Sequence, residues 1–328
     1  KLASITGLRV IDYLTFSNIG RSFPEFAGFE YNDLDKIDLG LLVDIDVPWM
    51  PLNAKLSPST FWAHIDIDPL KTATPVWTFP ANVRVQGKSS RILSQLTVKV
   101  QELATPAFKT KAKARSEALT SEQTSKAQRA EEMAADGGAI GEINPHFFCR
   151  ILGQLIAPED FIVNELVTRQ SIPNIQIARP IPNTMISNAG GGLGASGGTA
   201  LGVKLAKPDR CVIQIVGDGS FYFNNPTAVF AVAEQYRLPI FCIVLDNNGW
   251  AAVKGATLRV YPQGTAKEIG AYQSIHSPQM DFSKIAEAAG AYGEKLTRPE
   301  NIKSAITRCL EQVRAGHSAL LHVHVTKH

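Results

Sequence analysis

The chain has 328 residues, of which 33 are lysine or arginine and 30 are aspartate or glutamate, so its formal net charge is +3 at pH 7. This length is enough for two ordinary domains, and an apolar content of 45% is typical of a globular protein. The sequence has no basic cluster interleaved with aromatic residues and no apolar run of membrane-spanning length. We therefore expect neither nucleic acid nor a membrane as a partner.

The four cysteines, Cys149, Cys211, Cys242 and Cys309, lie far apart and have neither the spacing of a zinc site nor that of a disulfide framework. We expect reduced structural thiols and a cytoplasmic protein, with an organelle left open. The sequence begins at Lys1 without a methionine or an apolar signal segment, so we expect a fragment of a longer protein.

The N-terminal part of the chain has the pattern of an α/β domain. Apolar segments at 40–45 and 61–67 predict buried strands, and 89–103 has the spacing of an amphipathic helix. Asp66 and Asp68 end the second strand and could be metal ligands. We favour the alternative that they close the strand and cap the turn that follows it.

A polar segment separates this region from the rest. Residues 105–136 are rich in Lys, Ala, Glu, Ser and Gln, which predicts a charged, solvent-exposed helix closed by Gly137–Gly138. We therefore expect a first domain at 1–104, whose start is truncated, a linker at 105–141 and a second domain at 142–328.

The second domain opens with Asn144–Pro145, the pattern of a helix N-cap followed by a first-turn proline. A predicted strand at 161–164 comes next. A glycine-rich segment at 188–198 then leads into a helix at 199–206. Glycine at this density lets a backbone approach a ligand closely.

A strand, a helix and a strand follow. The apolar segment 211–216 predicts a buried strand that ends in Gly217–Asp218–Gly219, and Asn225–Pro226 predicts the start of a helix at about 227–236. The segment 240–245 is a second apolar strand. Because such a unit is parallel and right-handed, both strands end at the same edge of the sheet.

The second strand ends in Asp246–Asn247–Asn248–Gly249, so Asp218 is expected beside Asn247 and Asn248. Oxygen ligands at this edge suit Mg²⁺ or Ca²⁺. Because Mg²⁺ prefers to share its coordination sphere with phosphates, we expect a diphosphate to complete the site.

The GDGS segment, the helix and the strand ending in NNG resemble the thiamine-diphosphate fingerprint of the family that contains acetolactate synthase, pyruvate decarboxylase and benzoylformate decarboxylase. The resemblance covers most of 30–328 and is strongest over 164–250. It implies two Rossmann-like, doubly wound α/β domains with parallel sheets, joined by the charged helical linker. It also implies thiamine diphosphate and Mg²⁺ as cofactors and a lyase or carboligase activity, decarboxylase or acetolactate synthase-like, on a 2-oxo acid.

The resemblance also implies roles for particular residues. The metal ligands would be Asp218, Asn247 and the carbonyl of Gly249, with Asn248 as a substitute for Asn247. The residues expected at the cofactor are Thr168, Gly191, Leu193, Gly217, Gly219 and Ser220. Of these, Gly191 would offer its carbonyl to the aminopyrimidine and Leu193 would support the bent cofactor. Arg169 would meet a phosphate or a substrate carboxylate, or form a surface salt bridge.

The segment Ile65–Pro69 resembles the central domain of the same family, in which some members hold FAD or a nucleotide. No glycine-rich phosphate loop is present there, so we favour a structural role and leave FAD open.

In the family, a glutamate on a pyrimidine-binding domain activates the cofactor, commonly across a dimer. We see no such domain in this sequence, and expect it to come from the same precursor or another chain in a homo-oligomer. Glu165 is not expected to replace that glutamate, because it lies on the diphosphate side. His276 is a candidate proton donor, against the alternative of a surface histidine. The position that is acidic in pyruvate decarboxylases is about Val253 here, which argues against a copy of their proton relay.

Two functions remain open on the sequence. The first is the catalytic one above, and the second is a cofactor-binding or scaffold subunit without catalysis of its own. The catalytic residues are not identified.

Overall fold

The computed structural model describes residues 1–12, 19–20, 22–29, 31, 33–51, 54–75, 79–187, 192–276 and 279–327. The chain divides into two compact units, each described by itself: unit 1 is 1–13 with 23–124, and unit 2 is 14–22 with 125–328. The division falls inside the predicted linker, whose limits stay a prediction. Every helix within the described ranges is too short or too polar to cross a membrane.

Unit 1 is built on a three-stranded parallel sheet with the order β3-β4-β5. Its strands are β3 (Leu39–Val43), β4 (Phe61–Asp66) and β5 (Val83–Gln86), and its other elements are α1 (Leu2–Thr6), β1 (Val10–Ile11), β2 (Phe26–Gly28), η1 (Leu34–Lys36) and α2 (Ser89–Leu103). The core contains Trp49 and Trp62, whose ring centroids are 4.8 Å apart. The predicted helix at 89–103 and both predicted strands are confirmed.

The prediction of α/β domains with parallel sheets is confirmed, but unit 1 does not have the doubly wound arrangement that was predicted for both domains. The described residues between β3 and β4 contain no helix. Helix α3 (Pro106–Met133) is confirmed as a helix, but it is not solvated on all sides. Ala112 and Leu119 are buried, and the Arg115 guanidinium donates to the carbonyl of Thr6 over 2.5 Å.

The aspartates at the end of β4 close the strand, as favoured from the sequence. Asp66 Oδ1 accepts the Asp68 N–H over 2.8 Å, and Asp68 Oδ1 accepts the Lys71 N–H over 3.2 Å. The Lys71 ammonium lies 2.9 Å from Asp66 Oδ2. These bonds cap the turn after the strand.

Acid should weaken unit 1 through His64. This side chain is fully buried, and its Nδ1 lies 3.2 Å from Arg84 Nη1. Burial lowers the pKa of His64 below its ordinary value of 6.5, and Arg84 and Lys71 act in the same direction, against Asp66. The imidazole is therefore protonated more readily in the unfolded chain than in the folded one. The contribution of His64 to the free energy of unfolding is complete above about pH 6.5 and is lost as the pH falls below this value.

The Tm of both proteins should fall between about pH 7.5 and pH 5. We expect the fall to be smaller for His64→Gln than for the unchanged chain, by about 2 °C or more. Thermal unfolding followed by circular dichroism at both pH values measures this difference. Equal losses in the two proteins would show that His64 is not the acid-sensitive group.

Unit 2 is built on a six-stranded parallel sheet with the order β12-β13-β11-β10-β8-β9. Its strands are β8 (Phe161–Glu165), β9 (Met185–Ser187), β10 (Val212–Gly217), β11 (Phe241–Asp246), β12 (Tyr292–Leu296) and β13 (Ala319–His324). A separate two-stranded hairpin pairs β6 (Gly138–Ala139) with β7 (Glu142–Ile143). The predicted parallel pairing of the strands that carry GDG and NNG is confirmed, with Val216 opposite Val244.

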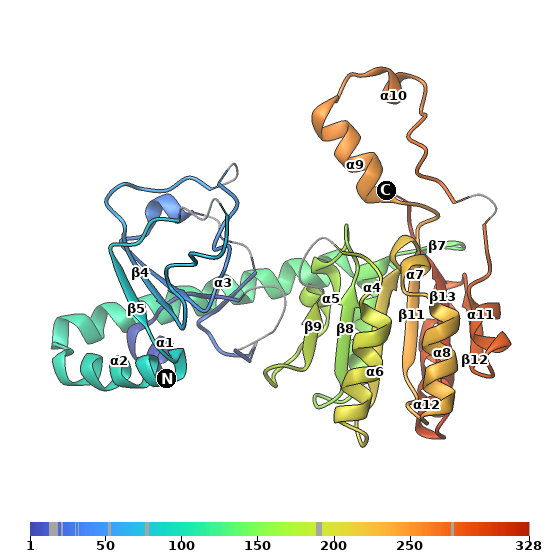
Figure 1. Cartoon of the computed structure of the whole chain (residues 1–328), viewed down its shortest axis with the longest axis horizontal. Helices are drawn as coiled ribbons and strands as arrows, with labels where there is room; N and C mark the ends of the chain where they lie inside the picture. The colour runs from blue at the N-terminus through green and yellow to red at the C-terminus, as the bar shows by residue number, and fades with distance from the viewer. Residues whose placement is uncertain are drawn as a thin grey trace. The chain divides into compact units, whose positions relative to one another are not determined.

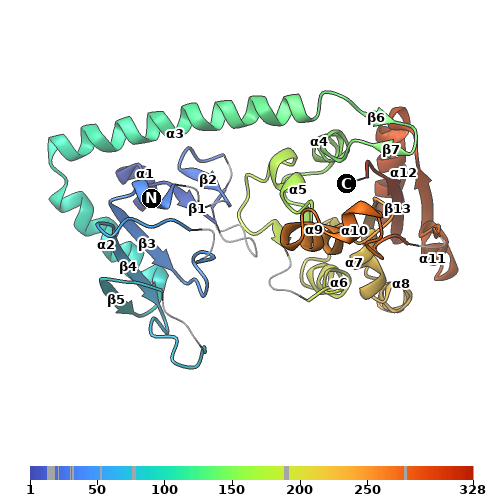
Figure 2. The ribbon, with the colours of Figure 1, turned by 90° about the horizontal axis from the view of Figure 1, so that it is seen from above.

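Helices cover both faces of this sheet (Figure 2). One face packs against α4 (Pro145–Leu155) and α12 (Ile302–Arg314), and the other packs against α6 (Ser196–Ala206), α8 (Pro226–Gln235) and α11 (Ser283–Ala288). Alternate residues of β11 serve the two faces, since Ile243 packs with α12 and Val244 packs with α8. The remaining elements are α5 (Ser171–Gln176), α7 (Asp218–Phe223), α9 (Ala251–Val260), α10 (Thr265–Glu268) and η2 (Pro299–Asn301).

The two predicted helix starts differ in detail. Asn144 caps α4 as expected, because its side-chain oxygen accepts the His146 N–H over 2.9 Å. Asn225 occupies the N-cap position of α8, but its φ of 47° is left-handed and its side chain forms no capping bond. The preceding turn is already helical as α7, which the sequence did not suggest.

The strand order reverses direction between β8 and β10. The chain runs outward from β8 to β9 and then returns to the other side of β8 to form β10. In open α/β sheets, ligands bind outside the carboxyl ends of the strands at such a reversal. Helices α9 and α10 lie beyond this edge of the sheet (Figure 1).

The cysteines behave as the sequence predicted. All four are free, and burial raises the pKa of the Cys149 thiol to about 12. A thiol with such a pKa is unreactive at neutral pH, so these residues are structural.

Candidate functional site

Asp218 stands at the reversal point of the sheet. Strand β10 ends at Gly217, and Asp218 is the first residue of α7. Its side chain is almost completely buried, and its Oδ2 accepts the N–H of Gly249 over 2.7 Å. The prediction that the GDG aspartate meets the loop after the next strand is therefore confirmed.

The loop after β11 is held by its own first residue. Asp246 Oδ1 accepts the Asn248 N–H over 2.7 Å, and Asn248 has a left-handed φ of 65°, which asparagine tolerates well. This turn directs the N–H of Gly249 at Asp218. The carbonyl of Gly249, predicted as a metal ligand, accepts the Ala251 N–H over 3.1 Å.

Two buried amide oxygens lie in this loop without a hydrogen-bond partner, Oδ1 of Asn247 and Oδ1 of Asn248. A buried acceptor without a donor is costly, so such atoms call for an explanation. Together with the Asp218 carboxyl they form a set of hard oxygen donors of the kind that Mg²⁺ takes beside a diphosphate. The residues present therefore fit the expected cofactor and its metal.

The carboxyls of Asp218 and Asp246 lie close enough to shift each other's pKa. Burial raises the pKa of Asp218 to about 8, and Asp246 contributes to this shift. Burial also acts to raise the pKa of Asp246, but hydrogen bonds from His322, Asp218 and the Asn248 N–H outweigh it and hold that pKa well below its usual range. Two buried carboxylates so close together repel each other when both are charged, so one of the pair keeps a proton. A bound cation could take the place of this proton.

His322 was missed by the sequence analysis. It is fully buried on β13, and its Nε2 lies 2.8 Å from Asp246 Oδ2. Its Nδ1 accepts the Phe282 N–H over 3.3 Å, so neutral His322 carries its proton on Nε2 and donates it to Asp246. The signal was available, because His322 and His324 alternate on the last predicted strand.

His276 lies at the site, with Nε2 3.3 Å from Asp218 Oδ2. Its ring packs edge-on to Trp250, with centroids 4.3 Å apart, and the backbone N–H of Trp250 donates to the carbonyl of Ser274 over 2.8 Å. Burial lowers the pKa of His276, against the effect of Asp246. The alternative of a surface histidine is therefore wrong, while its role as a proton donor stays a prediction.

Glu165, at the end of β8, holds the end of the glycine-rich segment. Its carboxylate accepts the backbone N–H groups of Gly194 over 2.6 Å, Ala195 over 3.3 Å and Ser196 over 3.0 Å. The Ser196 hydroxyl and the Asn224 amide also donate to it. These bonds fix the N-terminus of α6 next to the ends of β8 and β10.

Gly194 and Gly198 make a matched pair for substitution. Gly194 has a φ of 90°, and a Cβ atom there would lie 2.1 Å from the carbonyl oxygen of Phe223, whereas a Cβ at Gly198 would meet nothing within 4 Å. We expect Gly194→Ala to lower the free energy of unfolding by at least about 2 kcal/mol. Gly198→Ala lies inside α6 and should raise it by up to about 1 kcal/mol.

Urea unfolding of both variants checks this pair. If Gly194→Ala were as stable as the unchanged chain, the described path of the glycine-rich segment would be wrong.

The remaining predicted cofactor residues take varied positions. Thr168 is exposed in the turn after β8, Leu193 is 41% exposed, and Ser220 is buried in α7. A Cβ at Gly219 would lie 2.4 Å from Trp250 Cδ1, so the indole lies directly against the GDG turn. Gly191 is outside the described residues. The roles of these residues at a cofactor stay predictions.

Arg169 is half-buried in the turn after β8. Its Nη2 donates to the carbonyl of Thr326 over 2.5 Å, and burial lowers its pKa, against the effect of Asp218. The guanidinium therefore lies in the field of the Asp218 carboxyl.

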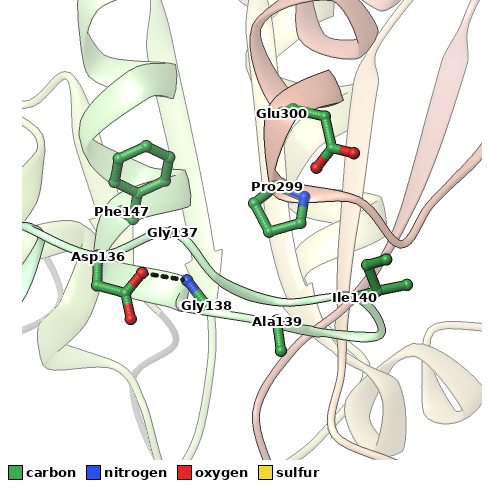
Figure 3. Close-up of a pocket in the computed structure, with 8 residues that line it drawn as sticks. All are labelled: Asp136, Gly137, Gly138, Ala139, Ile140, Phe147, Pro299 and Glu300. Carbon is green, nitrogen blue, oxygen red and sulfur yellow. Dashed lines mark hydrogen bonds between the residues drawn. The ribbon is translucent and has the colours of Figure 1, made fainter.

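A separate hollow lies beside the β6–β7 hairpin (Figure 3). It is lined by Asp136, Gly137, Gly138, Ala139, Ile140, Phe147, Pro299 and Glu300. The Gly138 N–H donates to Asp136 Oδ1 over 3.2 Å. None of the predicted site residues lines this hollow, so it is not part of the site at Asp218.

Residues 172–323 match the family described as thiamine pyrophosphate enzyme, C-terminal TPP binding domain. The chain is also distantly homologous to acetolactate synthase. It is 28% identical over 277 residues to the acetolactate synthase isozyme 3 large subunit of Escherichia coli, covering 83% of this chain and 44% of that protein.

Solved structures share the fold. Benzoylformate decarboxylase from Polynucleobacter necessarius superposes over 100% of this chain and 58% of its own, with a TM-score of 0.72 and 18% identity. The 4-hydroxybenzoylformate decarboxylase of Rhodococcus jostii RHA1 gives a TM-score of 0.73 with 20% identity, over the same shares of both chains. The chain thus spans about half the length of the proteins it resembles.

Proposed function

We propose that this chain supplies the diphosphate- and metal-binding half of a thiamine-diphosphate-dependent enzyme that breaks or forms a carbon–carbon bond in 2-oxo acids. The observation that carries the proposal is the contact between Asp218 and the Asn247–Gly249 loop, where two buried amide oxygens have no partner. This set of oxygens lies outside the carboxyl ends of neighbouring parallel strands, where α/β folds bind phosphates.

Mg²⁺ would be held by the Asp218 carboxylate, by the side-chain oxygen of Asn247 or Asn248, and by the Gly249 carbonyl. The residues that would contact the cofactor are Thr168, Gly191, Leu193, Gly217, Gly219 and Ser220. When bound, thiamine diphosphate supplies the electron sink for cleavage beside the carbonyl of a 2-oxo acid. The chain's own part is to fix the diphosphate and to neutralise its charge through the metal.

The group that activates the cofactor would come from outside these residues, on a pyrimidine-binding domain in the same or another chain of a homo-oligomer. Glu165 is unsuited to that task, because its carboxylate already accepts three backbone N–H groups at the start of α6. Unit 1 would serve as a structural central domain, with FAD as the less favoured alternative.

Isothermal titration of the purified chain with thiamine diphosphate tests the binding part. We expect binding in the presence of Mg²⁺ and its loss in EDTA. Release of CO₂ from pyruvate, 2-oxobutanoate and benzoylformate, measured on the chain in its native assembly with both cofactors, tests the chemistry. Cofactor binding that does not depend on a divalent cation would contradict the proposal.

A cofactor-binding subunit without catalysis is the second candidate. The observation that favours it is that the acidic side chains described around the site are already engaged, Glu165 by backbone donors and Asp218 by the Gly249 N–H. Tight, Mg²⁺-dependent binding without turnover of any 2-oxo acid in the native assembly would support this reading over the catalytic one.

A further inference from the structure

A second group of metal-ligating side chains lies at the ends of β11 and β13. Asp246 is paired directly with His324 across these two parallel strands, and His322 lies two residues earlier on the same face of β13. One ligand atom from each of the three residues lies within 4.8 Å of the others. The fold therefore gathers two imidazoles and one carboxylate at one point.

A purely structural explanation accounts for only part of this group. The bond of 2.8 Å between His322 Nε2 and Asp246 Oδ2 would serve to hold two strands together. His324 has no such partner at its Nε2, although this atom is buried, and its ring lies 4.7 Å from that of His322. An unpaired buried imidazole nitrogen beside a carboxylate points to a ligand that is shared among the three side chains.

Outer groups are in position to orient the imidazoles. Asp281 Oδ1, which accepts the Ser283 N–H and hydroxyl, lies 3.5 Å from His322 Nδ1. A histidine that binds a metal through one nitrogen commonly donates the other N–H to a carboxylate. With a metal on Nε2, the proton of His322 would move to Nδ1, which would then donate to Asp281 instead of accepting the Phe282 N–H. The Gln279 amide lies 3.5 Å from His324 Nδ1, and turning this amide by 180° would provide an acceptor there.

We propose that Asp246, His322 and His324 bind one divalent transition-metal ion of the zinc class, at a site next to Asp218 that uses different side chains from the proposed magnesium site. Two nitrogens and one carboxylate oxygen suit Zn²⁺, Co²⁺ or Ni²⁺, whereas Mg²⁺ prefers oxygen alone. Ligands at about 2.0–2.2 Å from a tetrahedral ion are about 3.3–3.6 Å apart, so only small side-chain shifts are needed. Three protein ligands leave a fourth position for water.

Cobalt titration of the purified chain tests the site. Mg²⁺ is kept in excess to saturate the oxygen ligands at Asp218, and visible d–d absorption reports Co²⁺ bound by imidazole. We expect absorption that saturates at one equivalent of Co²⁺ and is lost when one equivalent of Zn²⁺ is added. His324→Ala and His324→Gln should each lower the Co²⁺ affinity at least about tenfold, with the thermal unfolding of both variants unchanged.

Two matched histidine variants serve as controls. His276 is another imidazole beside a buried carboxylate, and His317 is exposed on the surface. His276→Ala and His317→Ala should bind Co²⁺ like the unchanged chain. The proposal is overturned if no d–d absorption develops at one equivalent, or if His276→Ala removes it while the His324 variants keep it.

Discussion

Replacement of Glu165 by alanine should lower the free energy of unfolding by about 3 kcal/mol or more. The carboxylate accepts three consecutive backbone N–H groups at the start of α6 and the amide of Asn224. Removing it leaves the buried Ser196 N–H and Asn224 amide unpaired, at about 1–3 kcal/mol for each, and also frees the part-buried N–H groups of Gly194 and Ala195. The midpoint of urea unfolding, at an unchanged denaturant slope, measures the loss.

Glu159→Ala is the matched control, because Glu159 is exposed just before the same strand. It should change stability by less than about 0.5 kcal/mol. Glu165→Gln should fall between the two, since an amide keeps one acceptor oxygen but turns a donor toward the N–H groups. A loss below about 1 kcal/mol for Glu165→Ala would mean that the contacts around Glu165 do not hold the glycine-rich segment.

Asp218→Ala should weaken Mg²⁺-dependent binding of thiamine diphosphate by about 100-fold or more. Loss of a residue that only orients a metal ligand costs 10- to 100-fold, so loss of a direct carboxylate ligand should cost at least as much. The chain itself should stay folded, because the metal-free Asp218 carboxyl is a protonated group whose pKa is raised to about 8. Isothermal titration gives the affinity, and thermal unfolding gives the fold check.

Asp209→Ala provides the control for this substitution. Asp209 is exposed and lies just before β10, at the opposite end of that strand from Asp218. Its variant should bind the cofactor like the unchanged chain. An Asp218→Ala protein that kept its affinity and its dependence on Mg²⁺ would remove Asp218 from the site.

The sequence predicted the backbone of the site because two local rules decide it. Apolar runs bounded by glycine and asparagine mark β10 and β11, and parallel pairing then brings Asp218 to the Asn247–Gly249 loop. These rules need only the order of the elements along the chain.

The side chains that support the site depend on neighbours that the sequence does not reveal. Strand β13 pairs with β11 although 72 residues lie between Asp246 and Ala319, so the contact of His322 with Asp246 could not be read from local spacing. His276 reaches Asp218 only because Ser274 pairs with the loop at Trp250. The bonds of Glu165 to the start of α6 likewise follow from the close packing of β8 and α6.

Helix α3 shows a different limit. Its charged, alanine-rich composition is typical of a solvated helix, yet small residues such as Ala112 are buried within unit 1. Composition averages over the two sides of a helix and therefore misses a narrow buried stripe.

The most direct test of the central claim is the anomalous scattering of Mn²⁺ in crystals of the chain grown with thiamine diphosphate. The account predicts one strong peak within coordination distance of the Asp218 carboxylate and of the amide oxygen of Asn247 or Asn248, next to the diphosphate. A diphosphate bound elsewhere, or a peak that does not touch Asp218, would contradict it.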